Sequence, residues 1–451
     1  MEERIQNPLG IVPISRLLPS MSAPIMLSML VQALYNVVDS IFVLRVSEQA
    51  LTAVSLAFPI QNLMISVGVG TAIGAGALIS RRLGEKNYTD ANLAANNAMF
   101  LVLLSSIAFM LFGIFGSGAF YRAFTSDPEL IRKGVGYLRI VSGVPFGIFY
   151  TVLGERFVQM TGKSTYSMAA QLCGAITNII LDPILIFGLF GLPRLETVGA
   201  ALATVIGQFV NLIVVFWFNH RYNHELTLRL SEWKLVPRIV RDIYSVGLPS
   251  ILMQAIGSVM TFGMNKILIF FSETAVNVFG IYFKLQSFVF MPLFGLNSGM
   301  VPIVGYNFGA RKKQRIFDTL RLALLIGLGI MLAGLLIFQL LPRFILTVIF
   351  KSPPDLLEMG IPALRIISTC FLPAAVSVVF SGAFQALGAG IYSMIMSFCR
   401  QLVVLLPAAW LLGRLFGVTA VWWAFPIAEI FALALSIFFY LRIYNRTLKD
   451  L

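Results

Sequence analysis

Charged residues are scarce in this chain. Asp, Glu, Lys and Arg make up 12% of its 451 residues, whereas soluble proteins carry roughly 25%. Hydrophobic residues make up 58%, and the mean hydropathy is +0.87. This composition excludes an ordinary soluble domain and predicts an integral membrane protein surrounded by lipid.

Cysteine is also scarce. The three residues Cys173, Cys370 and Cys399 are an odd number and fall inside hydrophobic stretches without the spacing of metal ligands, so we expect small core residues. A basic segment followed by a short cleavable apolar core is missing before the first hydrophobic stretch. We therefore expect a retained cytoplasmic tail at the N-terminus rather than a signal peptide.

Long hydrophobic runs, in contrast, are abundant. About twelve stretches are long enough to cross a hydrocarbon core of roughly 30 Å. Long continuous runs favour helices over barrel strands, which are short and alternate in polarity. The predicted spans of this all-α protein are 17–44, 51–80, 93–121, 135–158, 167–191, 197–219, 240–271, 275–305, 318–349, 360–385, 392–413 and 419–442.

The sequence contains an internal repeat. Residues 24–84 match residues 249–309 without a gap, and Gln159 and Gly162 match Gln385 and Gly388 later in each half. Fused repeats in a hydrophobic chain are typical of transporters. Each half holds six predicted spans, and an even number means that both halves enter the membrane from the same side. We therefore expect two six-helix lobes related by a pseudo-two-fold axis along the membrane normal.

The most polar internal segment, 220–241, separates the two halves. We predict an N-lobe at 1–219, an inter-lobe linker at 220–241 and a C-lobe at 242–451. The net charge of +13 comes from basic residues in short connections, so it does not indicate nucleic-acid binding. The side that holds the linker and the tails carries roughly twice the Lys and Arg of the other side, which places the linker and both termini in the cytoplasm.

Four acids fall well inside the predicted spans: Asp39, Glu155, Asp182 and Glu429. A charge at this depth costs a few kcal/mol and indicates function by default. Tyr35 and Asn36 share the helix face of Asp39, just as Asn178 lies one turn before Asp182. We assign Gln32 to the same polar region.

Carboxylate and amide oxygens together are suited to Na+, and two nearby carboxylates can also share and exchange a proton. The alternative is structural, in which each Asp caps a kink or pairs with a Lys or Arg on a neighbouring helix. The same two explanations apply to Glu155 and Glu429. We expect Glu429 to pair with one of the cations Lys266, Lys284 and Arg400, whereas a position facing the cavity is the alternative; Glu155 and its neighbour Arg156 each require a partner elsewhere.

Two prolines lie near these acids. Pro24 and Pro183 each remove a backbone hydrogen bond within a predicted span. We expect kinks there, and a bent first span could change shape when Asp39 binds a proton. A static kink is the alternative.

Several motifs occur together along the chain: Ala23-Pro24, Tyr35 to Asp39, Gly84 with Asn87, Glu155 to Gly162, Asn178 to Pro183, and Gly199 to Thr204. With these motifs, nearly the whole chain resembles one family, the multidrug and toxic compound extrusion (MATE) transporters, here of the DinF/MepA-like branch.

This resemblance implies two lobes that form a V around a central cavity and export amphipathic, often cationic compounds against H+ or Na+. It implies a cation site at Asp39, Asn178, Asp182 and Thr204, with Tyr35 and Tyr137 nearby. Spans 7 and 10 lack the acids of the NorM type. We thus expect a multi-pass monomer of the bacterial inner membrane whose partners are small amphipathic drugs and lipid, without a cofactor.

Other classes remain as alternatives. A lipid-linked saccharide flippase of the same superfamily is the nearest, although its cavity would carry more Arg and Lys than the first half shows. A major facilitator lacks support because Ser80 to Lys86 does not reproduce its basic loop motif. An intramembrane aspartyl protease would need a Gly-x-Gly-Asp pattern, which neither Asp39 nor Asp182 has, so we expect no enzyme.

Overall fold

The computed structural model describes residues 7–229, 233–449 and 451, and within these ranges it consists of helices and connections without strands. Ten helices are long and apolar enough to cross a membrane, and two further pairs, each bent at a short break, bring the spans to twelve. The twelve predicted spans are thereby confirmed. Helices fulfil every backbone hydrogen bond within their own segment, which a lipid environment requires.

The first half of the chain forms one group of helices. Its elements are α1 (Pro8–Ile11), α2 (Ile14–Val46), α3 (Glu48–Gly84), α4 (Tyr88–Leu111), the π-helix η1 (Phe112–Gly116), α5 (Ser117–Phe124), α6 (Pro128–Gly143), α7 (Phe146–Met160), α8 (Ser164–Phe187), the short η2 (Leu189–Gly191) and α9 (Thr197–Tyr222).

The second half forms the other group. It contains α10 (Pro237–Phe271), α11 (Glu273–Gly309), α12 (Lys313–Leu340), α13 (Pro342–Phe344), the π-helix η4 (Ile345–Ile349), α14 (Pro354–Ser368), α15 (Phe371–Ala386), α16 (Gly390–Phe398), the π-helix η5 (Cys399–Leu405), α17 (Leu406–Phe416), α18 (Val418–Val421), α19 (Ala424–Ile443) and the π-helix η6 (Tyr444–Leu448).

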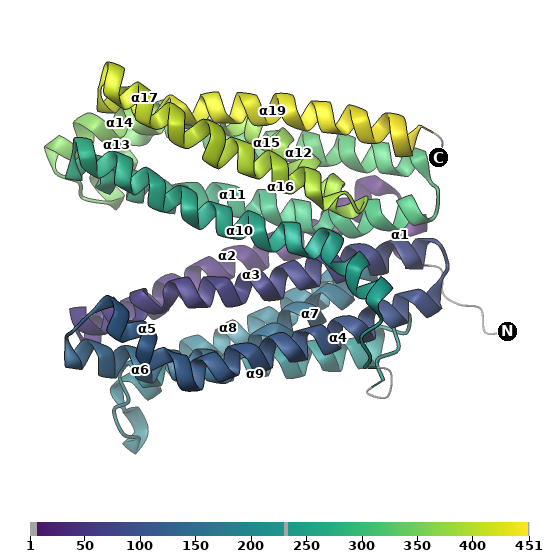
Figure 1. Cartoon of the computed structure of the whole chain (residues 1–451), viewed down its shortest axis with the longest axis horizontal. Helices are drawn as coiled ribbons and strands as arrows, with labels where there is room; N and C mark the ends of the chain where they lie inside the picture. The colour runs from purple at the N-terminus through teal and green to yellow at the C-terminus, as the bar shows by residue number, and fades with distance from the viewer. Residues whose placement is uncertain (1–6, 230–232, 450) are drawn as a thin grey trace.

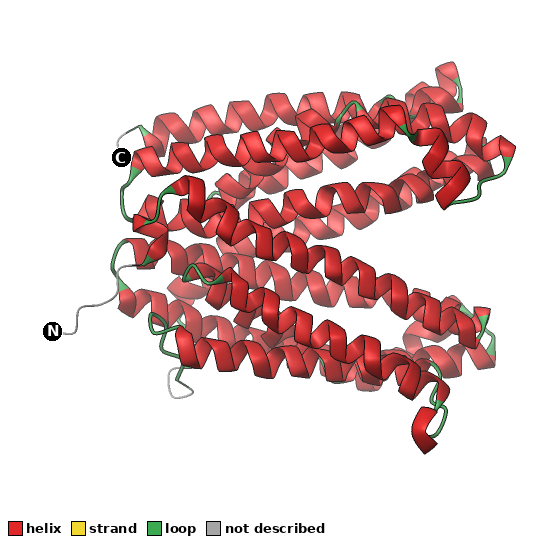
Figure 2. Cartoon of the chain, turned by 180° about the vertical axis from the view of Figure 1, so that it is seen from behind, coloured by secondary structure: helices red, strands yellow, loops and turns green. Residues whose placement is uncertain are grey.

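The two groups are two lobes that meet at one end. Figure 1 shows α2–α9 below and α10–α19 above, with α1 and the last turns of α19 at the same end of the molecule. The ribbons of the lobes lie close together at this end and diverge toward the other, which is also seen from behind in Figure 2. We call the end with α1 the closed end.

Glycines of the repeat form the contact between the lobes. A Cβ on Gly74 of α3 would lie 2.1 Å from the carbonyl oxygen of Ile243 on α10, and a Cβ on Gly299 of α11 would lie 2.4 Å from the hydroxyl of Ser22 on α2. Gly84 and Gly309 contact the opposite lobe's backbone in the same way. Only a residue without a Cβ permits this approach, so the repeated glycines form a two-fold seam between the lobes.

Two spans that we predicted as continuous, 135–158 and 360–385, are each broken. The chain turns by 42° between α6 and α7 and by 48° between α14 and α15. In the first break, Pro145 keeps Val144 out of the helical region, at φ −126° and ψ 58°. The breaks lie at equivalent positions of the two repeats, so each lobe has a bend in its fourth span.

Pro24 and Pro183 lie inside helices that continue past them. Because Pro24 has no N–H, the carbonyl of Ser20 lacks its usual donor, and the hydroxyl of Ser164 on α8 supplies one at 3.4 Å. The kinks that we expect at these two prolines stay a prediction. Among the cysteines, Cys370 is buried as expected, whereas Cys173 is exposed and is not a core residue.

The connection between the lobes is bound along α4. Helix α9 extends to Tyr222 and α10 begins at Pro237, so helix occupies both ends of the predicted linker 220–241. Side-chain oxygens of Asn92, Asn96 and Asn97 accept hydrogen bonds from linker backbone N–H groups at 2.8 to 2.9 Å. These amides fix the linker to the N-lobe. Residues 1–6 of the predicted tail and 230–232 of the linker lie outside the described residues.

Helix α1 lies across the closed end. Its buried Leu9 offers a carbonyl to Asn307 and Arg315 of the C-lobe, each at 3.0 Å. On the other side, the amide of Asn7 donates to Glu225 of the linker at 2.7 Å. Burial raises the pKa of the Glu225 carboxyl, while Asn7 and then Lys163 oppose that effect. The N-terminal segment therefore connects the C-lobe to the linker.

Candidate functional site

Two carboxyl groups face each other inside the N-lobe. Asp39 on α2 and Asp182 on α8 lie close enough to share a hydrogen bond once one of them carries a proton. Asp182 is fully buried, and one oxygen of each carboxyl is buried without a protein partner. In the described ranges neither acid forms an ion pair with Lys or Arg. The structural alternative of an ion pair therefore lacks support in this part of the chain.

Asn178 extends this group by one helical turn. Its amide nitrogen lies 3.5 Å from a carboxyl oxygen of Asp182, and its own carbonyl oxygen is buried and unpartnered. Three buried oxygens, from Asp39, Asn178 and Asp182, thus lack a donor. A buried oxygen without a hydrogen-bond donor costs free energy, and carboxylate and amide oxygens are of the type that binds hard cations.

Thr204 lies on the helix that packs against this group. Helices α8 and α9 approach closely where a Cβ on Gly207 would lie 2.8 Å from the carbonyl of Gly174 and 3.1 Å from the Cβ of Asn178. Thr204 precedes Gly207 by three residues, so it shares that face of α9. Its hydroxyl makes no hydrogen bond to any group in the described ranges and is available as a fourth oxygen.

Two tyrosines surround the acids. The hydroxyl of buried Tyr137 accepts a hydrogen bond from Gln61 at 2.9 Å. It is also close enough to Asp39 for the charge of that carboxylate to act on it. Tyr35 is close enough to both acids for their charges to act on its hydroxyl. It lies beside Gln32, whose side-chain oxygen accepts a hydrogen bond from Gln171 at 3.0 Å. The sequence did not single out Gln61 for this site, because an uncharged amide carries no burial penalty large enough to draw attention.

Asn36 differs from the other assigned residues. Its side chain is exposed, and no hydrogen bond connects that side chain to Asp39 in the described structure. The sequence-assigned residues Asp39, Asn178 and Asp182 are therefore brought together, Tyr35 and Tyr137 flank them, and Asn36 lies outside the cluster.

The other two intramembrane acids have separate partners. The amide of Asn211 donates to Glu155 at 3.0 Å, whereas Arg156 donates to Gln159 at 3.0 Å. Arg400 donates to Glu429 at 2.7 Å, with side chains 24% and 12% exposed. The expected pairing of Glu429 with a cation is confirmed, and its partner is Arg400.

A cavity of about 490 Å³ lies between the lobes, mostly against the C-lobe. Its apolar lining includes Met29, Met160, Met253 and Phe294. The polar lining comes from α7, α10, α11, α15, α16 and η5, and comprises Arg156, Ser250, Gln254, Asn297, Ser298, Ser377, Ser381, Gln385, Ser397, Arg400 and Gln401. None of Gln32, Tyr35, Asn36 and Tyr137 lines it. The cavity and the acid pair are therefore two separate sites.

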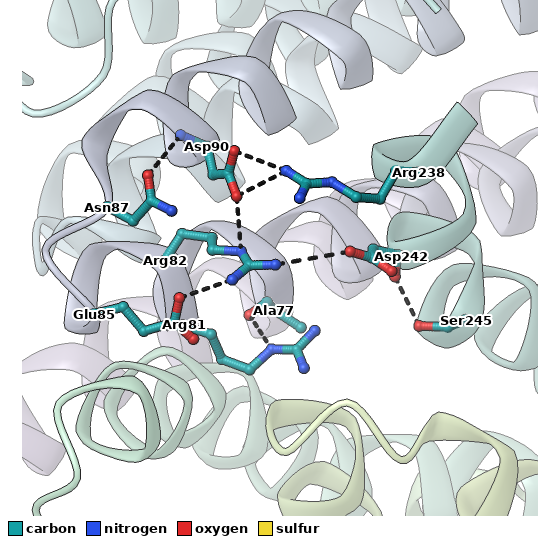
Figure 3. Close-up of polar contacts among 9 residues, drawn as sticks. All are labelled: Ala77, Arg81, Arg82, Glu85, Asn87, Asp90, Arg238, Asp242 and Ser245. Carbon is teal, nitrogen blue, oxygen red and sulfur yellow. Dashed lines mark hydrogen bonds and ion pairs between the residues drawn. The ribbon is translucent and has the colours of Figure 1, made fainter. Parts of the chain in front are cut away.

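A charged network joins the lobes at the closed end (Figure 3). Asp90 of α4 accepts from Arg238 of α10 through both carboxylate oxygens at 3.0 Å. Arg82 of α3 lies between Glu85 at 2.8 Å, Asp90 at 3.6 Å and Asp242 of α10 at 3.8 Å. Single exposed ion pairs contribute little, but this network connects N-lobe helices to the first helix of the C-lobe. We call it the closed-end network.

The MatE family model matches residues 24–184 and, a second time, residues 249–411. The two matches coincide with the two copies of the repeat. The multidrug export protein MepA of Staphylococcus haemolyticus is 28% identical over 95% of this chain and 94% of its own length. MepA of Staphylococcus aureus strain MSSA476 is 27% identical, with the same coverage.

Solved structures give the same result. A multidrug resistance MATE family transporter of the MOP superfamily, in an outward-facing conformation, superposes with a TM-score of 0.91 at 25% identity, over 98% of this chain and 99% of that one. A MATE protein crystallised with MaL6 gives a TM-score of 0.92 at 25% identity, over 99% and 100%. The similarity spans both lobes.

Proposed function

Because the chain belongs to the MatE family, the multidrug and toxic compound extrusion transporters, we propose that it exports amphipathic compounds in exchange for H+ or Na+. The observation that carries this proposal is the pair of acids Asp39 and Asp182 in the N-lobe. Asp182 is fully buried, each acid has one buried oxygen without a hydrogen-bond partner, and Asn178 lies beside Asp182. Its MepA relatives are multidrug export proteins.

The coupling ion would bind at Asp39, Asn178, Asp182 and Thr204. Carboxylate, amide and hydroxyl oxygens form a hard donor set that fits Na+. Two facing carboxyl groups also favour proton uptake, because at short distance the two negative charges repel each other and one group tends to stay protonated. Both ions are compatible with this donor set.

Alternating access in this proposal requires the closed end to open. The two lobes would move about the glycine seam, with the bends between α6 and α7 and between α14 and α15 taking up the motion. The closed-end network and α1 would separate in the opposite state. Binding of an ion at Asp39 would shift α2, whose Ser22 lies against Gly299 of the other lobe, and so connect the ion site to the seam.

The proposed setting is the bacterial inner membrane. The connections rich in Lys and Arg, at α3–α4, α9–α10 and α11–α12, all lie at the closed end together with α1. The positive-inside bias would place this end and both termini in the cytoplasm, so the lobes would open outward. The proposed division is an N-lobe at 1–219, a linker at 220–241 and a C-lobe at 242–451, acting as a monomer.

Transport in proteoliposomes tests the proposal. The purified chain should export a fluorescent amphipath under an imposed Na+ gradient or, separately, an imposed pH gradient. Asp39→Asn should reduce that transport to background, because an amide neither takes up a proton nor carries the negative charge that attracts Na+. Glu48→Gln is the matched control, since Glu48 is a carboxylate at the start of α3. Normal gradient-driven export by correctly folded Asp39→Asn protein would refute the assignment.

A lipid-linked saccharide flippase is the second candidate. The observation that favours it is the presence of Arg156 and Arg400 in the cavity lining, since such lipids carry phosphate groups. Translocation of a polyprenyl-linked sugar without any ion gradient would support this candidate over drug export.

A further inference from the structure

We propose that the cavity between the lobes binds its substrate through an anionic group, a carboxylate, sulfonate or phosphate, that contacts Arg156 and Arg400. The substrate class is then an anionic amphipath. This inference rests on the proposed export function, and it adds the charge of the molecule that is exported.

The charges that line the cavity are of one sign. Arg156 and Arg400 both contribute to its wall, whereas none of the described carboxylates does. The two nearest acids are held by other groups: Glu155 accepts from Asn211, and Glu429 accepts from Arg400. A ligand in the cavity therefore meets two guanidinium groups: that of Arg156, which forms no ion pair in the described ranges, and that of Arg400, which donates from one nitrogen to Glu429.

Arg156 lacks a carboxylate partner. Its side chain donates to the neutral amide of Gln159 at 3.0 Å, and Gln159 in turn donates to Ser167 at 2.9 Å. No ion pair to Arg156 exists within the described ranges. A guanidinium is always charged and presents several N–H donors in a planar fork, so the donors of Arg156 that remain free suit an anionic ligand.

Arg400 is placed by an irregular backbone. It belongs to the π-helix η5, Cys399–Leu405, which interrupts the eleventh span. Single-turn π-helices are rare and occur frequently at functional sites. The equivalent position in the first repeat is Gly174, within the regular α-helix α8. At this position the second lobe thus has a charged residue and a π-helical backbone, where the first lobe has a glycine in a regular α-helix.

The remaining lining fits the rest of an amphipath. Flexible Met29, Met160 and Met253 with Phe294 form an adaptable apolar wall. The volume of about 490 Å³ falls in the range of small-molecule sites, roughly 300–1,000 Å³.

Two steroid probes that differ only in head-group charge test the inference. Binding of taurocholate, a sulfonate, is compared with binding of the same steroid carrying a trimethylammonium group, using purified full-length protein in lipid nanodiscs. The sulfonate should bind at least tenfold more tightly. Arg156→Gln should weaken its binding roughly tenfold, since charge-assisted hydrogen bonds are lost, while the affinity for the cationic steroid stays equal or rises.

Matched variants keep the result interpretable. Arg122→Gln changes an exposed arginine of α5 and should leave both affinities unaltered. Arg156→Lys retains the charge without the planar fork and should bind the sulfonate with intermediate affinity, so a folding defect in one variant does not decide the outcome. A third probe, a polyprenyl phosphate, separates the two sources of an anionic group: preferential binding of this lipid indicates lipid translocation, and preference for taurocholate indicates export of a free amphipath.

Two results would overturn the inference: tighter binding of the cationic steroid by the unmodified protein, or unchanged sulfonate binding by both Arg156 variants. Neither result touches the proposed ion-coupled export, which depends on Asp39. Conversely, normal export by Asp39→Asn would remove the coupling proposal and leave the charge preference of the cavity intact.

Discussion

The two lobes share one scaffold but carry their buried charges at different places. Asp39 and Asp182 of the N-lobe have Met264 and Ala408 as their repeat equivalents, whereas Arg400 and Glu429 of the C-lobe have Gly174 and Ala203. The N-lobe acids face each other without a cation, but the C-lobe charges form a pair at 2.7 Å. In the described ranges the protein supplies no counter-charge to the N-lobe acids, whereas Glu429 has one in Arg400. The duplication therefore repeated the helical scaffold, whereas the charged residues inside the two lobes differ.

Neutralising an acid in each lobe should give the largest contrast. Asp182→Asn removes a carboxylate with no protein counter-charge, and gradient-driven transport in proteoliposomes should fall to background. Glu429→Gln removes one that already has a partner and should retain ion coupling, measured as the dependence of transport on the imposed gradient. Loss of gradient dependence in Glu429→Gln, with Asp182→Asn unaffected, would reverse the roles of the lobes.

Breaking the C-lobe pair should chiefly affect stability. Arg400→Gln leaves Glu429 buried with neither oxygen compensated, and the cost should be roughly 3 kcal/mol, the lower end for a buried pair because Arg400 is partly exposed. Thermal unfolding of the purified protein in detergent measures the change. Replacing both residues by Met should recover most of the loss. A double variant as unstable as the single one would show that the charge pairing contributes little.

The seam allows a finer comparison between equivalent positions. Gly74→Ala would bring a methyl group against a backbone carbonyl, but Gly299→Ala would bring it against the hydroxyl of Ser22 and that residue's backbone. The side chain of Ser22 can rotate away from an added methyl group, whereas the backbone carbonyl of Ile243 is fixed in its helix. Gly74→Ala should therefore open the closed end more than Gly299→Ala does, and should lower transport several-fold. Spin-label distances between α3 and α10 would measure the opening. Gly329→Ala in α12, with open space around it, should change nothing, and equal effects at all three positions would contradict a seam.

Much of the fold could be predicted from the sequence because lipid imposes a simple rule. Long apolar runs become spans, and the constant offset between the repeats revealed the two lobes. The bends between α6 and α7 and between α14 and α15 were not predicted, since hydropathy does not report a turn of a residue or two inside an apolar stretch.

The candidate site could be predicted from the sequence through its acidic residues. Asp39 and Asp182 stood out because a buried acid is costly, and the structure brings them together. The cavity near the C-lobe was missed because its walls combine Ser, Gln, Met and Arg from helices that are distant in sequence. Neither residue type nor spacing places Arg156 and Arg400 around one space; only the packing of the lobes does.

The glycine seam has a consequence for the two halves considered as independent chains. Each half carries both surfaces of the seam, a second helix bearing the glycines and a first helix against which the other half's glycines pack. One copy of the unit is thus complementary to itself, and two such copies would associate through the same pair of contacts as a symmetric dimer. The linker on α4 then fixes the ratio of the two halves at one to one and removes the need for them to meet by diffusion. Once joined, the halves no longer had to stay identical, so the pair Asp39 and Asp182 could arise in the first half and the pair Arg400 and Glu429 in the second.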